Sequence, residues 1–196
     1  MRNTLLIICS VFAIATAKGQ TTEEVYDRYL DFNLARLEGR TNDAMELGEK
    51  LLPDTAKLTR KNLTNFYYSI GKLYEDDSQS VKALPYYERV AAVVPNYYVV
   101  QRALGYLYAK QADDLADEIK ASAANEQESQ RLTKLYNAKL KQALPYLEKA
   151  QACDPDDDTL SRIKTFYNIM KDEQGAANLE NRLAKLSKNC IDLLEN

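Results

Sequence analysis

The chain has 196 residues, of which 45% are hydrophobic and 28% charged, and its formal net charge is −3. This is the composition of an ordinary globular domain, and the slightly acidic balance argues against a nucleic-acid partner. Histidine is absent, which excludes histidine-based catalytic triads and most zinc or iron sites. Six glycines and five prolines over this length favour long helices over a turn-rich β fold.

The first twenty residues have the features of an export signal. Arg2 precedes an apolar run over residues 5–15, and Ala15-Thr16-Ala17 supplies the small residues that a signal peptidase recognises. The run is shorter than the roughly twenty residues that a membrane-spanning helix needs. We expect residues 1–19 to be a cleaved Sec signal peptide, with an uncleaved N-terminal anchor as the alternative. The mature chain would then have no membrane span and be exported to the periplasm, the outer membrane or the medium.

The segment 20–53 is predicted to be a capping helix pair. Apolar residues recur at helical spacing over 25–37 and over 44–52. A break near Gly39 separates the two helices, and Pro53 ends the second.

Two short sequences then occur twice. Residues 70–74 align with 104–108 at an offset of 34, and Gly, Leu and the last Tyr coincide. Residues 83–88 (ALPYYE) align with 143–148 (ALPYLE) at an offset of 60. One unit therefore occurs twice. The two offsets differ by 26, so the second copy has 26 extra residues between its halves. In each half, small and aromatic residues at a spacing of three or four share one helical face, as two closely packed helices require.

These residues resemble the tetratricopeptide repeat (TPR) family. Its signature falls on Gly71, Tyr74, Ala83, Tyr87 and Pro95 in the first unit, and on Gly105, Tyr108, Ala143, Leu147 and Pro155 in the second. The resemblance implies an all-α, right-handed superhelical solenoid of antiparallel helix pairs. It places a TPR-like domain over 54–196, with units at about 64–97 and 98–157 and a degenerate C-terminal cap at 158–190.

The 26 extra residues of the second unit have their own helical pattern. Residues 111–136 lack proline and glycine and keep helical spacing. We interpret them as an elongated helical hairpin with its turn within 121–129, and a mobile charged loop is the alternative. The C-terminal cap is expected to pair a helix over 160–170 with one over 176–194. An oxidising compartment would permit a disulfide between Cys153 and Cys190, and two separate, partly buried thiols are the alternative.

The TPR resemblance also implies a concave groove lined by the first helices of successive units. Carried onto this chain, the groove includes Asn65, Tyr68, Lys72, Arg102 and Tyr106. Tyrosine and arginine are frequent interface anchors, so these residues would form an amphipathic, partly cationic strip. The alternative is that the tyrosines simply pack against neighbouring helices.

The sequence contains no glycine-rich phosphate loop, no metal-spaced cysteine cluster and no histidine to activate a serine. We therefore expect no enzymatic activity and no cofactor. The resemblance implies a protein-interaction scaffold or assembly adaptor of the bacterial envelope, which binds a peptide segment or a partner domain. A glycan-binding or uptake accessory is the alternative, although the lack of tryptophan counts against it.

Overall fold

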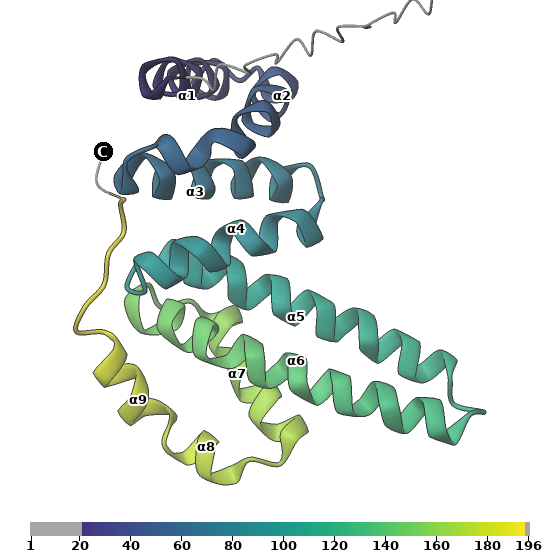
Figure 1. Cartoon of the computed structure of the whole chain (residues 1–196). Coiled ribbons are helices and arrows are strands. Elements are labelled where there is room, and N and C mark those ends of the chain that lie inside the picture. Colours follow the sequence, from purple (N-terminus) through teal and green to yellow (C-terminus); the bar gives the residue numbers. More distant parts are fainter. Residues whose placement is uncertain (1–20, 195–196) are drawn as a thin grey trace, which may run out of the picture.

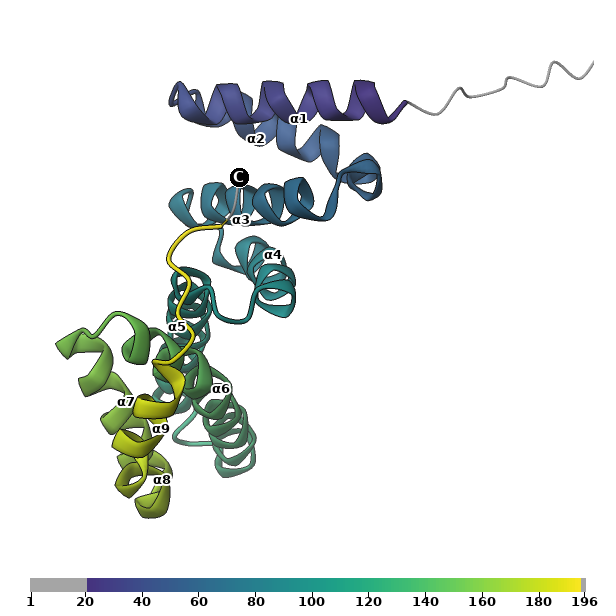
Figure 2. The same ribbon diagram turned by 90° about the vertical axis from the view of Figure 1, so that its left-hand side faces the viewer.

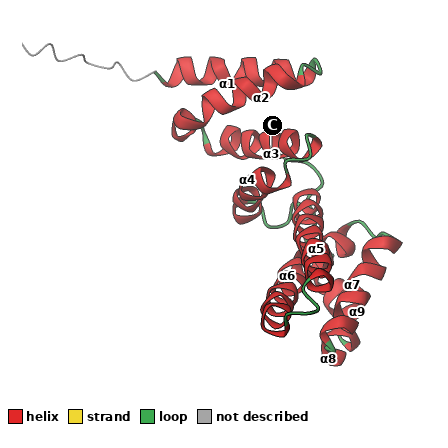
Figure 3. Ribbon diagram, turned by 90° about the vertical axis from the view of Figure 1, so that its right-hand side faces the viewer, coloured by secondary structure: helices red, strands yellow, loops and turns green. Residues whose placement is uncertain are grey.

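The computed structural model describes residues 21–194, and every regular element in that range is a helix (Figure 3). The predicted signal peptide, 1–19, lies outside the described residues. The helices follow one another as antiparallel pairs along a stack (Figure 1), which confirms the predicted all-α architecture of helix pairs. Within the described range, no helix is both long and apolar enough to cross a membrane.

The pairs follow the chain order. The first pair is α1 (Thr22–Leu37) and α2 (Thr41–Leu51), followed by the short 3-10 helix η1 (Leu52–Lys57). The second is α3 (Arg60–Asp76) and α4 (Ser80–Val93), and the third is α5 (Tyr98–Ala121) and α6 (Glu126–Cys153). The last combines α7 (Asp157–Met170) with two short helices, α8 (Glu173–Ala177) and α9 (Leu179–Leu186).

Side-chain caps fix the starts of several helices. Thr21 accepts a hydrogen bond from the Glu24 amide, and Glu24 accepts one from the Thr21 amide, which is a complete capping box at α1. Thr59 caps α3 and Asp156 caps α7 in the same manner, each by accepting from an amide of the first turn. These side chains satisfy amide groups that have no partner inside the helix.

Glycines allow the two helices of a pair to approach closely. A Cβ added at Gly71 of α3 would lie 3.0 Å from the ring of Tyr87 on α4. A Cβ added at Gly105 of α5 would lie 2.6 Å from the side chain of Leu147 on α6. The small residue of the first helix and the large residue of the second therefore interlock in both copies of the unit.

A recurring tyrosine–glutamate hydrogen bond joins each pair to the one before it. In every case a tyrosine of the first helix donates to a glutamate on the second helix of the preceding pair. The contacts are Tyr74 to Glu49, Tyr108 to Glu88, and Tyr167 to Glu148. Glu88 and Glu148 are the glutamates that the two repeated sequences share, so the repeat encodes contacts between pairs as well as within them.

The tyrosine that follows the repeated proline makes the same ring contact in both copies of the unit, with a tyrosine of the first helix of its own pair. Tyr86 stacks on Tyr74 with ring centroids 5.8 Å apart and an interplanar angle of 11°. Tyr146 stacks on Tyr108 at 5.7 Å and 16°. Tyr74 and Tyr108 therefore each make two contacts: the ring stacks within its own pair, and the hydroxyl donates a hydrogen bond to the preceding pair.

The third pair is the predicted elongated hairpin. Its helices α5 and α6 extend well beyond the neighbouring pairs (Figure 1). A short turn over residues 122–125 connects them. Leu132 near the tip is only 3% exposed, so the two helices pack together along their length. The alternative of a mobile charged loop is therefore wrong.

The predicted helix over 176–194 is also wrong. The helix is interrupted at Asn178 and ends at Leu186, and residues 187–194, here called the tail, run back along the stack (Figure 2). The ammonium of Lys149 donates to the carbonyl oxygens of Leu186 and Asn189 at 2.9 and 2.8 Å, and so holds the chain where it leaves the helix.

Candidate protein-binding face

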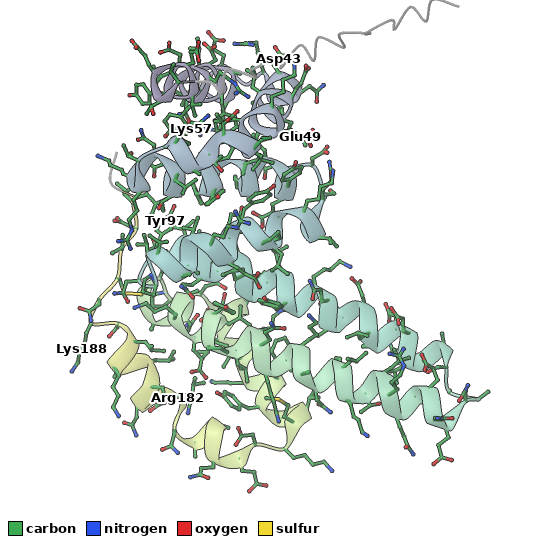
Figure 4. The ribbon with its side chains drawn as sticks, in the orientation of Figure 1. Asp43, Glu49, Lys57, Tyr97, Arg182 and Lys188 are labelled. Carbon is green, nitrogen blue, oxygen red and sulfur yellow. A yellow bond between two sulfur atoms is a disulfide. The ribbon has the colours of Figure 1, made fainter. Side chains whose placement is uncertain are left out.

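The tail pairs with the start of α5 through backbone hydrogen bonds. The Ile191 amide donates to the carbonyl of Asn96 at 2.9 Å, and the Tyr98 amide donates to the carbonyl of Ile191 at 3.1 Å. Tyr98 is the first residue of α5, so its amide has no acceptor inside the helix. The tail therefore satisfies a free amide at a helix end, beside Tyr97 (Figure 4).

Two further contacts attach the tail before it reaches α5. The structure joins Cys190 of the tail to Cys153 at the end of α6 by a disulfide, with Cα atoms 5.5 Å apart. Lys149, one turn earlier on α6, is 7% exposed, and its ammonium holds the carbonyl oxygens of Leu186 and Asn189. Burial lowers the pKa of the Lys149 ammonium.

An apolar hollow of about 540 Å³ lies between the tail and the second helix pair, and we call it the tail hollow. Its lining comes from three segments. The first turns of α3 supply Arg60, Lys61, Thr64 and Asn65, the end of α4 supplies Val93 and Val94, and the tail supplies Ile191, Leu193 and Leu194. This volume is in the range of sites that bind small molecules or a few peptide side chains.

Two cations flank the tail hollow. Arg60 and Lys61 are both exposed, and no carboxylate within residues 21–194 pairs with either of them. Lys72, the other cation of α3, is paired with Asp76 of the same helix. An apolar hollow with unpaired positive charge beside it can accept an apolar segment that carries negative charge.

The predicted groove residues on α3 lie near this face. Asn65 lines the tail hollow. The ring of Tyr68 packs edge-on against Tyr97 with centroids 5.4 Å apart, and so supports the backbone that pairs with the tail. Lys72 lies further along α3 and forms its ion pair on the same helix.

The predicted groove residues on α5 have different surroundings. Arg102 donates to the carboxylate of Asp154 at 2.8 Å and to its carbonyl oxygen at 2.7 Å. The hydroxyl of Tyr106 lies 2.9 Å from that of Thr159 on α7. Asn65 and Tyr68 therefore lie near the tail and the residue that pairs with it, whereas Arg102 contacts Asp154 at the end of α6 and Tyr106 contacts Thr159 on α7. That the five residues line one groove stays a prediction.

The tail contacts were not predicted from the sequence. The only signal for them was Cys190, whose pairing with Cys153 was one of two alternatives. The apolar residues after Cys190 continue a helical spacing, and that spacing concealed their role in lining the hollow.

Within residues 21–194, no group of three or more histidine, cysteine or acidic residues is placed to hold a metal ion. The repeated tyrosines stack on one another, as Tyr74 does with Tyr86.

Comparison with known proteins gives only distant likenesses. No protein-family model matches the chain, and no curated protein matches it in sequence. A crystal structure from Podosopora anserina, described as a kinesin light chain with nearly identical TPR-like repeats, is 16% identical. The match covers 86% of this chain and 97% of that one with a TM-score of 0.35, and a single-substitution variant of the same protein gives the same identity and TM-score. At this TM-score the fold assignment depends on the helix arrangement described above.

Proposed function

We propose that this protein is a non-enzymatic protein-interaction scaffold that binds a peptide segment of a partner at the tail hollow. The observation that carries the proposal is the apolar hollow of about 540 Å³, bordered by Arg60 and Lys61, on a face that already holds an irregular chain segment by backbone hydrogen bonds. The resemblance of the repeated residues to the TPR family supports the same function.

We further propose that the protein acts in the bacterial envelope. The signal-like residues 1–19 favour export. The disulfide between Cys153 and Cys190 is of the kind that persists in oxidising compartments such as the periplasm. An adaptor of envelope assembly would combine both features.

Site-specific photocrosslinking in the native cell tests the binding function. A photoreactive amino acid at Lys61, beside the tail hollow, should yield an adduct with a discrete partner protein. The same residue at Val81 of α4, which is 81% exposed and does not line the hollow, is the control. No adduct from position 61, or the same adducts from both positions, would contradict the proposal.

A further inference from the structure

We propose that the tail hollow binds a partner segment in which apolar side chains are flanked by a carboxylate, and that the tail is a fixed wall of this site. The inference rests on the function proposed above and adds the chemistry of the partner and the condition under which the site exists. That condition is the disulfide between Cys153 and Cys190, which holds the tail in place.

The charge of the site indicates the partner's chemistry. Arg60 and Lys61 occupy consecutive positions in the first turn of α3, and both are exposed beside the hollow. Positive side chains in the first turn are unfavourable for the helix itself, because the N-terminal end of the helix dipole is also positive. A carboxylate from a partner would relieve this local excess of positive charge, and apolar side chains next to it would enter the hollow.

The apolar walls of the hollow keep solvent-accessible surface. Val93 at the end of α4 is 39% exposed, and Ile191 and Leu193 of the tail are 37% and 76% exposed. Apolar surface on two sides of one hollow would be removed from water by a ligand that lies between them, and such burial is the main favourable term in peptide binding.

The attachments of the tail indicate that it is a wall and not a displaceable occupant. Lys149 holds it at residues 186 and 189, the disulfide holds it at Cys190, and the start of α5 holds it at Ile191. These contacts fix consecutive parts of the tail, so a partner peptide would have to break all of them to displace it. Binding beside the tail requires none of them to break.

Selection from a displayed library of random 12-residue peptides on the full chain tests the partner chemistry. We expect the enriched peptides to combine two or more apolar residues with an adjacent Asp or Glu. Binding of a synthetic enriched peptide should fall at least tenfold in Arg60→Glu/Lys61→Glu. It should be unchanged in Lys134→Glu/Lys141→Glu, which reverses two exposed charges on α6. No enrichment, enrichment without acidic residues, or equal binding by both variants would overturn the proposal.

A second comparison tests the role of the tail with the same peptide. Tyr98→Pro removes the amide that donates to Ile191, whereas Tyr98→Ala removes the same side chain and keeps the amide. Proline is well tolerated at the first position of a helix, and the preceding residue, Tyr97, already has extended backbone angles. We expect at least fivefold weaker peptide binding by Tyr98→Pro than by Tyr98→Ala, and a similar loss in Cys153→Ser/Cys190→Ser.

Equal binding by Tyr98→Pro and Tyr98→Ala would show that the tail is not a wall of the site.

The proposed partner chemistry and the proposed scaffold function can fail separately. A partner crosslinked from position 61 whose bound segment lacks acidic residues would leave the proposed function standing and overturn the partner chemistry.

Discussion

The hydroxyl of Tyr74 on α3 donates a 2.8 Å hydrogen bond to the carboxylate of Glu49 on α2. This contact joins the second helix pair to the first, and the equivalent bonds at Tyr108 and Tyr167 join the later pairs. The ring of Tyr74 also stacks on Tyr86 of its own pair. One side chain thus links the packing within a pair to the packing between pairs.

The contacts of Glu148 in the last pair should contribute more to stability than the single hydrogen bond of Tyr74 to Glu49. Glu148 is 5% exposed and also forms a bidentate ion pair with Arg182, whereas Glu49 is exposed. Arg182→Leu leaves a buried carboxylate without its cation and should lower the free energy of unfolding by about 3 kcal/mol. Tyr74→Phe removes a single hydrogen bond and should cost about 1 kcal/mol. Urea denaturation of the two variants provides the measurement, and equal losses would contradict the assignment.

The two interlocking glycines should differ in their tolerance of a methyl group. At Gly105 an added Cβ would lie 2.6 Å from the Leu147 side chain and 3.0 Å from its backbone nitrogen, whereas at Gly71 it would meet a ring at 3.0 Å. Gly105→Ala should therefore destabilise the protein by about 1–2 kcal/mol, since helix backbone cannot move aside as a ring can. Gly71→Ala should be close to neutral, because the better helix propensity of alanine offsets a small shift of Tyr87. Thermal unfolding followed by circular dichroism ranks the two variants, and the reverse order would refute this interpretation.

The buried tyrosines predict a loss of stability in alkali. Burial, and then hydrogen bonds to Glu75 and Glu88, raise the pKa values of Tyr87 and Tyr108 above their usual value. The folded protein therefore retains these protons at a pH where tyrosines of the unfolded chain, with pKa values near 10, lose them. The resulting stability is fully present below about pH 10 and is lost as the pH rises through the folded-state values.

Tyrosinate absorbance near 295 nm tests the prediction that stability falls as the pH rises. The buried tyrosines Tyr87 and Tyr108 should ionise only together with unfolding, at a pH above the value of about 10 that is usual for tyrosine in an unfolded chain. A single reversible transition of all tyrosines near pH 10, with the helices intact, would show that the tyrosines are not buried as described.

The disulfide closes a long loop and should stabilise the last helix pair. Cys153 and Cys190 are 37 residues apart, and a link of this separation restricts the unfolded chain by about 3–4 kcal/mol. Cys153→Ser/Cys190→Ser should lower the unfolding free energy by up to that amount and leave the first two pairs helical. Denaturation in the presence and absence of a reductant provides the measurement. An unfolding free energy that is indifferent to reduction would contradict the pairing.

The sequence was sufficient to predict packing between residues that lie close together along the chain. Gly71 and Tyr87 contact each other across one short turn, so their spacing along the chain already indicates the packing. The path of the tail could not be predicted, because it depends on Lys149 and on the start of α5, which lie far away in the sequence. The ion pair of Arg102 could not be predicted for the same reason, because its partner, Asp154, follows the elongated hairpin and lies 52 residues away.

Hydrogen exchange of the Ile191 amide is the most direct test of the account, because the proposed binding face depends on a tail that is fixed against α5. The amide donates to the Asn96 carbonyl at 2.9 Å, and the neighbouring disulfide holds the segment in place. We predict exchange of this amide at least a hundredfold slower than in an unstructured peptide, and acceleration in Tyr98→Pro but not in Tyr98→Ala. Exchange at the rate of an unstructured peptide in the oxidised, unaltered protein would contradict the account.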